Sequence, residues 1–196
     1  MQYLIVGLGN PGEEYAGTRH NVGRIMLEEF RKKYDFPVLE KDKTLKALIS
    51  KGSWHKDKLI LLAPDNFMNV SGKSVAPLVK NAKDAERTIV VYDDLDLPLG
   101  TIKISFNRSS GGHKGVESII KALKTPAFVR VRVGICPVTP SGKPRKPKGD
   151  GAILDFIVGP FKKPEQEVVK KTAKKVVAVL DTILSEGRIK AMGEVN

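Results

Sequence analysis

Short apolar runs typical of buried strands alternate along the chain with segments whose apolar residues recur at helical spacing. The clearest strand is residues 88–92 (TIVVY), a β-branched run that is followed by two aspartates. The clearest helical stripe begins near Pro164 and ends before Gly187. This interleaving predicts an α/β fold: a mixed, twisted β-sheet sandwiched between α-helices, with an amphipathic helix toward the C-terminus.

Other elements follow from periodicity and turn residues. Helices are expected over residues 21–34, 71–81 and 111–123, and strands over residues 3–7, 45–51, 58–63, 101–106 and 128–135. The last of these strands alternates arginine with apolar residues, which predicts one exposed, basic face. Residues 137–150 are rich in Pro, Gly and Lys and are expected to form a mobile basic loop. Because no repeat or linker interrupts the pattern, residues 1–196 are predicted to form a single domain.

The 196-residue chain carries 34 Lys and Arg against 22 Asp and Glu, a formal net charge of +12. Such an excess favours a polyanionic partner; a basic surface without one is the alternative. No apolar run approaches the ~20 residues that cross a bilayer, and the first nine residues lack the features of a signal peptide. The single cysteine, Cys136, excludes a disulfide framework. We therefore expect a cytoplasmic protein with no membrane segment.

Gly7, Gly9 and Gly12 match the spacing of the dinucleotide-binding fingerprint. That fingerprint needs its third glycine in the first turn of a helix, whereas Pro11 and about eight polar residues separate these glycines from the next predicted helix. A nicotinamide-dependent oxidoreductase is therefore the less favoured interpretation.

Asp93, Asp94 and Asp96 offer the oxygen ligands that Mg²⁺ prefers. We favour the alternative, a turn in which one aspartate ends the strand and the others are solvated. The three histidines show no zinc-binding spacing, so no metal site is expected.

Polar residues follow two of the predicted strands. Asn10 follows the first strand and Asp93 the central one, so both are expected beyond the carboxyl ends of the sheet, where open α/β folds place their pockets. His20 and Asn69 precede the first two predicted helices. One imidazole with a carboxylate partner is sufficient for general-base activation of water, although a lone histidine is more often a surface or hydrogen-bonded residue.

Five stretches occur in the order of the motifs of one enzyme family: GLGNPG (7–12), TRHNVG (18–23) after Tyr15, FMNVSG (67–72), DDLDLP (93–98) and GGHKG (111–115). Together they resemble the bacterial-type peptidyl-tRNA hydrolases, and the likeness covers nearly the whole chain. The resemblance implies a compact α/β monomer that hydrolyses the ester between a peptide and the 3′ ribose of tRNA. It also implies that the reaction uses no metal and no cofactor.

The resemblance further assigns roles to single residues. His20 would be the general base that activates water, and Asp93 would hold its imidazole in the required tautomer. Asn69 would donate to the developing oxyanion, and Asn10 would bind substrate beside the base. By the same resemblance, binding of substrate and tRNA would involve Tyr15, Asn10, Phe67, Met68, Asn69, His113, Lys114 and Arg132.

Two positions near this site depart from the family pattern. Lys114 stands where the family usually has asparagine; lysine only donates hydrogen bonds and adds a charge. Tyr92 stands where many relatives have histidine. Because it neighbours Asp93 on a strand, its side chain is expected to point to the opposite face, with little catalytic consequence.

The tRNA-binding surface departs from the pattern as well. Arg132 would clamp a backbone phosphate, but Ser105 replaces the second lysine of the clamp, for which Lys103 or Arg108 are candidate substitutes. Basic residues of the 137–150 loop and of the last helix would extend the surface, or form a solvated basic face. A non-catalytic RNA-binding relative with this fold is the second functional hypothesis, and Lys114 is the feature in its favour.

Overall fold

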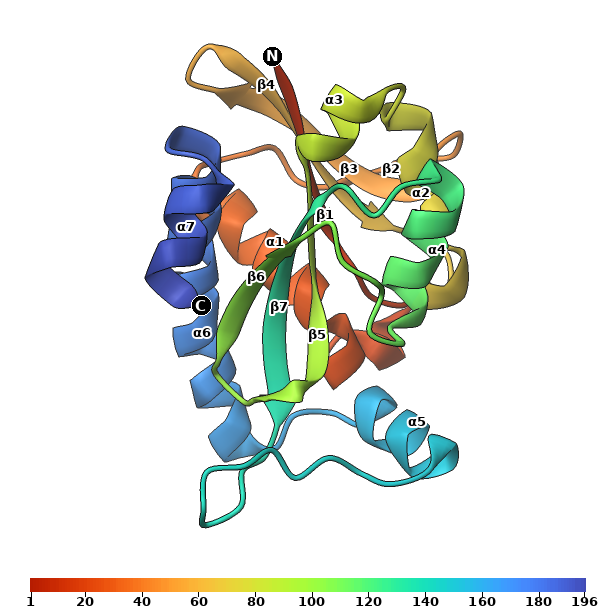
Figure 1. Ribbon diagram of the computed structural model, residues 1–196. Helices are drawn as coiled ribbons and strands as arrows, with labels where there is room; N and C mark the ends of the chain where they lie inside the picture. Colours follow the sequence, from red (N-terminus) through yellow and green to blue (C-terminus); the bar gives the residue numbers. More distant parts are fainter.

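A computed structural model describes all 196 residues and contains one mixed, seven-stranded sheet (Figure 1). The strands are β1 (Gln2–Gly7), β2 (Glu40–Asp42), β3 (Ala47–Trp54), β4 (Asp57–Pro64), β5 (Thr88–Pro98), β6 (Ile102–Phe106) and β7 (Val129–Cys136). Their order across the sheet is β2-β3-β4-β1-β5-β7-β6. The four central strands, β4, β1, β5 and β7, run parallel, and antiparallel strands flank them on both sides.

The chain also forms seven α-helices and four short 3-10 helices, and the last three α-helices follow the last strand. The α-helices are α1 (Val22–Lys33), α2 (Gly72–Val75), α3 (Ala82–Glu86), α4 (Lys114–Leu123), α5 (Asp150–Val158), α6 (Lys163–Ser185) and α7 (Arg188–Val195). The 3-10 helices are η1 (Glu13–Tyr15), η2 (Arg19–Asn21), η3 (Met68–Val70) and η4 (Ala76–Leu78). None of the helices is both long enough and apolar enough to span a membrane.

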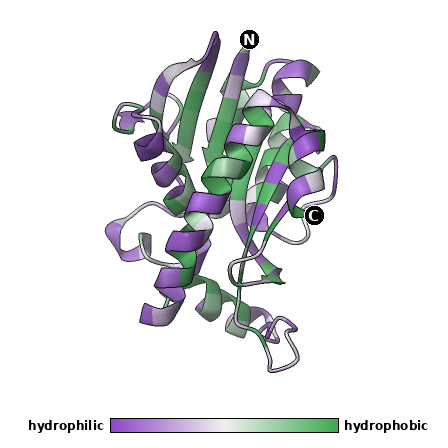
Figure 2. Cartoon of the chain, turned by 90° about the vertical axis from the view of Figure 1, so that its left-hand side faces the viewer, coloured by the Kyte–Doolittle hydropathy of each residue, from purple (hydrophilic) through white to green (hydrophobic).

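Helices cover both faces of the sheet, and this confirms the predicted α/β class (Figure 1). On one face, α1 and α6 pack against apolar side chains such as Ile5, Val91 and Val131. On the other face, α2 and α4 cover a second cluster that includes Val6 and Val90. Because the central strands are buried on both sides, they are almost continuously apolar, and Figure 2 shows these strands mostly in green.

Several elements differ from the sequence prediction. The helix predicted over residues 71–81 is broken: α2 ends at Val75, and η4 follows with Pro77 in its first turn, because proline cannot continue an α-helix. The side chain of Ser71 donates to the carbonyl of Met68 and does not cap α2. The short elements β2, α3, α5 and α7 had no clear periodic signal, and β5 continues to Pro98, beyond its apolar run.

The prediction of an exposed basic face on residues 128–135 is wrong. Every residue of β7 is buried except Arg132. Arg130 is only 2% exposed, and its Nη1 donates to the carbonyl of Ser109 at 2.6 Å. Arg132 is partly exposed, at 27% of its side chain. The alternation therefore marks a strand that buries one of its two arginines.

The outer edge of β6 is paired with the C-terminal residue. The side-chain oxygen of Asn196 accepts from the amide of Ile104 at 2.8 Å, and its Nδ2 donates to the carbonyl of Ile104 at 2.9 Å. Nearby, the Arg188 guanidinium of α7 stacks 3.9 Å above the ring of Phe106. These contacts hold α7 against β6, the strand at one edge of the sheet.

Candidate active site

The candidate site lies where the carboxyl ends of β1, β4 and β5 meet. From β1 the chain continues to β4, which lies on one side of β1 in the sheet. It then continues to β5, which lies on the other side of β1. At such a reversal the connections diverge and leave a crevice at the carboxyl edge of the sheet. Asn10 follows β1 and η3 follows β4, as expected from the sequence, while Asp93 lies within β5, two residues beyond its last pairing with β1 at Val91.

Two glycines allow the start of α1 to approach this edge closely. A Cβ atom on Gly23 would lie 2.3 Å from the carbonyl oxygen of Val91 in β5, and one on Gly7 would lie 2.6 Å from the carbonyl oxygen of Gly23. Helix-to-strand packing therefore requires Gly7, which explains part of the apparent dinucleotide fingerprint. Because η2 precedes α1 directly, the same approach sets His20 beside the end of β5.

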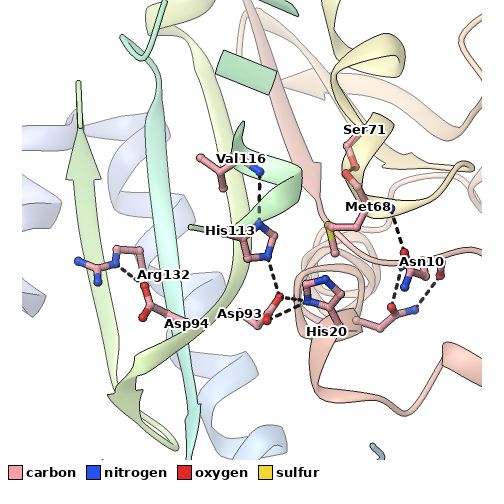
Figure 3. Close-up of polar contacts among 10 residues, drawn as sticks. Asn10, His20, Met68, Ser71, Asp93, Asp94, His113, Val116 and Arg132 are labelled. Carbon is pink, nitrogen blue, oxygen red and sulfur yellow. Dashed lines mark hydrogen bonds and ion pairs between the residues drawn. The ribbon is translucent and has the colours of Figure 1, made fainter. Parts of the chain in front are cut away.

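The carboxylate of Asp93 binds two histidines (Figure 3). His20 Nδ1 lies 2.9 Å from Asp93 Oδ1 and 3.0 Å from Oδ2. His113 Nε2 lies 3.0 Å from Oδ1. The two histidines reach the carboxylate from opposite faces of the sheet. His20 lies in η2, directly before α1 on one face, and His113 caps α4 on the other face. Asp93 is 3% exposed and His20 8%, so the network is shielded from bulk water.

Burial and charge act in opposite directions on this network. Burial lowers the pKa of His20, but the negative charge of Asp93 and the hydrogen bond to it outweigh burial, so the pKa of His20 lies above 6.5. Burial alone would raise the pKa of Asp93, but the electrostatic attraction of His20 and His113 and the hydrogen bonds from both imidazoles hold it well below its usual range. Asp93 is therefore an ionised acceptor at neutral pH.

His20, Asp93 and His113 are also residue types that bind metal ions, with ligand atoms within 4.8 Å of one another. The sequence did not indicate this cluster, because the three residues come from distant segments. However, His113 Nδ1 accepts the backbone N–H of Val116 at 3.3 Å. A histidine that binds a metal through Nε2 carries its proton on Nδ1 and donates it to an acceptor. The cluster therefore fits a hydrogen-bonded network better than a metal centre.

A cavity of about 490 Å³ opens beside His20. Its polar wall includes Asp93, His113 and Lys114, and its apolar wall includes Ile153, Leu154 and Ile157 of α5. Tyr92 also lines it, edge-on against His113 with 4.8 Å between ring centroids. Tyr92 belongs to the apolar cluster on the α4 face, as strand alternation predicts, but it is not remote from the site. Burial raises the pKa of Tyr92 to about 12, so its hydroxyl stays protonated.

Asn10 and Met68 lie on the other side of His20 (Figure 3). Asn10 Oδ1 accepts the backbone N–H of Met68 at 3.0 Å, and the backbone of Asn10 is held on both sides by the side-chain amide of Asn21. Asn21 therefore fixes the site and does not cap α1. Asn69 and Phe67 are exposed, the latter at 60%, while Tyr15 on η1 is half-buried. No hydrogen bond within the chain joins any of these three to His20.

Arg132 lies on the far side of Asp93 (Figure 3). Its Nε donates to Asp94 Oδ2 at 2.7 Å, and the side chain lines a second cavity of about 550 Å³ together with Lys103, Ser105 and Arg108. The two cavities share Asp94, so the predicted phosphate clamp adjoins the His20 cavity but does not form it.

The three aspartates in the second half of β5 each have a basic partner. Asp93 binds the two histidines, Asp94 binds Arg132, and Asp96 Oδ1 lies 2.8 Å from Lys146 Nζ. Asp93 and Asp94 are thus held in largely buried contacts with basic side chains, whereas Asp96, 59% exposed, is solvated as the favoured interpretation expected. The sequence also did not predict that α5 forms the apolar wall of the cavity. Helix α5 has no buried residues, so its sequence carries no amphipathic pattern.

Comparisons with known proteins agree with this architecture. The family profile described as peptidyl-tRNA hydrolase matches residues 4–196. The chain is 42% identical to a peptidyl-tRNA hydrolase of Herpetosiphon aurantiacus, covering 99% of this chain and 90% of the relative, and 38% identical to that of Carboxydothermus hydrogenoformans, covering 99% and 98%. A crystal structure of the Acinetobacter baumannii peptidyl-tRNA hydrolase superimposes with a TM-score of 0.87 at 30% identity, covering 99% of this chain and 94% of that one. The chain therefore belongs to the peptidyl-tRNA hydrolase family.

Proposed function

We propose that this protein hydrolyses the ester bond between the peptide and the 3′ ribose of peptidyl-tRNA, with His20 as the general base. One observation carries the proposal: Nδ1 of His20 contacts Asp93, while Nε2 has no partner within the chain and the residue lines a cavity. An imidazole fixed at one nitrogen and free at the other can remove a proton from a bound water. Membership of the family supports the choice of substrate.

The reaction proceeds by direct attack of water. His20 Nε2 takes a proton from the water as its oxygen bonds to the ester carbonyl carbon. Asp93 accepts the Nδ1–H of His20 and stabilises the imidazolium that forms. The imidazolium then returns the proton to the 3′ oxygen as the carbon–oxygen bond breaks. The products are a peptide carboxylic acid and a tRNA with a free 3′ hydroxyl. The reaction thereby recycles the tRNA of peptidyl-tRNA that was released prematurely.

Two asparagines assist the base. The side chain of Asn69 is exposed and makes no hydrogen bond within the chain, so its amide is available to donate to the oxyanion. The oxygen of Asn10 is occupied by Met68 N–H, which leaves Nδ2 of Asn10 directed to substrate beside His20. General-base catalysis contributes ~10²- to 10⁴-fold and one oxyanion donor ~10²- to 10³-fold. Because an ester expels an alkoxide far more readily than an amide expels nitrogen, these groups are sufficient without a covalent nucleophile.

The tRNA end is bound by residues around the two cavities. Tyr15 and Phe67 line the approach on the Asn10 side, Met68, 4% exposed, supports it from the apolar core, and Lys114, 72% exposed, contacts the terminal sugar or phosphate. Arg132, already oriented by Asp94, binds a backbone phosphate. The formal charge of +12 supports a polyanionic partner. The protein acts as a cytoplasmic monomer without metal or cofactor.

Release of an N-blocked aminoacyl group from tRNA tests the proposal. Wild-type protein is expected to turn over, His20→Ala to lose at least ~10²-fold in kcat, and both to bind tRNA equally. Dialysis against a chelator is the control for metal independence. Binding of tRNA without turnover by the wild type would favour the non-catalytic RNA-binding alternative.

A further inference from the structure

Two imidazoles bind one carboxylate in this site, and their environments differ in one respect. Both His20 and His113 contact Asp93 Oδ1, at 2.9 and 3.0 Å, and their ring centroids are 5.1 Å apart. Both side chains are about one-tenth exposed. Distance and burial therefore do not decide which ring accepts the catalytic proton.

The difference lies at the second nitrogen of each ring. His113 is the N-cap residue of α4, and its Nδ1 accepts the N–H of Val116 in the first helical turn. This nitrogen must therefore be unprotonated, which places the proton of His113 on Nε2, directed at Asp93. A proton on Nδ1 would face the N–H of Val116 and the positive end of the helix. Nε2 of His20 has no such donor against it.

We propose that His113 is a positioning residue: a neutral donor of fixed tautomer that occupies part of the Asp93 carboxylate, so that His20 alone takes up the proton. The inference deepens the proposed function and rests on it for the role of His20. It also changes the expected role of His113, because both of its nitrogens are engaged within the chain and neither is available to bind tRNA.

The contact from His113 weakens the hold of Asp93 on His20. Asp93 Oδ1 accepts two N–H groups, and its negative charge is distributed between them. Without His113, the carboxylate would interact more strongly with the protonated form of His20, which would then release its proton only at higher pH. His113 therefore keeps His20 available as a neutral base.

Other charged groups face His20 across the cavity and must be unchanged in any test. They are Asp94 and Asp96 of β5, Lys114 of α4, Lys146 of the 137–150 loop and Asp150 of α5. Asp94 and Asp96 are neutralised by Arg132 and Lys146 respectively. The hydroxyl of Tyr92, which packs on His113, stays protonated.

Nitrogen-15 NMR of the imidazoles in the wild-type protein tests the tautomer without any assay of activity. The three histidines are assigned by substitution to Gln, one at a time. At neutral pH, His113 is expected to carry its proton on Nε2 and none on Nδ1, while the signals of His20 are expected to change with pH. A protonated Nδ1 on His113 at neutral pH, or a titrating His113 beside an invariant His20, would overturn the proposal.

The dependence of kcat/KM on pH tests the consequence. His113→Leu removes both nitrogens at similar volume, and the acidic limb of the profile is expected to move to higher pH by about half a unit or more. His113→Gln retains a donor for Asp93 and an acceptor for Val116, and its limb should stay within about 0.2 units of the wild type. If the acidic limbs of the pH profiles of His113→Leu and the wild type coincide, the inference is refuted. If the wild type has no hydrolase activity, the proposed function fails, while the NMR result still decides the tautomer.

Discussion

Arg19, the residue before His20, offers a direct test of how the site is held in place. Its side chain is 7% exposed. Nη1 donates to the carbonyls of Phe156, Gly159 and Pro160 at 3.4, 3.2 and 2.9 Å, and Nη2 lies 2.8 Å from Glu165 Oε2. The guanidinium also stacks 4.4 Å from the ring centroid of Phe156. Arg19 thus ties the end of α5 and the start of α6 to η2.

Arg19→Met preserves the length and the apolar stem but removes every one of these hydrogen bonds. Three carbonyls lose a donor, and Glu165, only 14% exposed, loses its counter-charge. Removing one partner of a buried ion pair costs about 3–5 kcal/mol. In a domain of this size each kcal/mol lowers Tm by about 2–4 °C, so Tm should fall by roughly 6 to 20 °C.

Thermal unfolding monitored by circular dichroism measures the change. Lys170→Met on α6 is the matched control, because Lys170 forms an ion pair with Glu167 in which both side chains are largely exposed, and its loss should change Tm little. Amide hydrogen exchange over α5 should also be faster in Arg19→Met. A decrease in Tm no larger than that of the control would show that the buried cluster does not hold these elements together.

Four further outcomes are expected. Because the folded-state pKa of His20 is raised above 6.5, its stabilising charge is present below that value and lost as pH rises through the folded pKa. As pH rises through the pKa of His20, the urea midpoint of the wild type should therefore fall relative to that of His20→Gln, while kcat/KM of the wild type rises. Midpoints that change equally with pH in the two proteins would contradict this expectation. Asp93→Asn should lower kcat by ~10³- to 10⁴-fold with the fold intact, since the neutral amide cannot stabilise the imidazolium of His20 by charge; near-normal turnover would exclude the role of Asp93. Lys114→Asn should leave tRNA affinity nearly intact, because the asparagine amide can also hydrogen-bond the terminal sugar or phosphate, and should change kcat only modestly, whereas complete inactivity would make the lysine essential. Finally, tRNA affinity should fall as salt rises, and a flat response would argue against phosphate contacts.

The central architecture could be predicted because its signals are local. The buried strands are long apolar runs, and α6 has a regular apolar stripe, so pattern alone places them. The pairing of His20 with Asp93 could be anticipated from the carboxyl ends of the strands and from motif resemblance. The structure brings these two side chains into contact.

Other features depend on contacts between distant segments, which no local pattern reveals. The sequence alone suggests that Arg130 is exposed, but it is buried and donates to Ser109, 21 positions away, and the salt bridge between Asp94 and Arg132 joins residues 38 positions apart. The capping contact of His113 with Val116 is local, and the order His-x-x-Val at a helix start could have suggested it. Its significance appears only when Asp93 is placed at the other ring nitrogen.

The pairing of Asn196 with Ile104 has a consequence for self-association. A side-chain amide carries the same donor and acceptor as a peptide group, so Asn196 occupies the hydrogen-bonding positions that an incoming strand would use. The opposite margin of the sheet is formed by β2, which is only three residues long. Neither margin therefore presents a long template for strand addition, and the protein is protected against pairing its sheet with a strand of another chain.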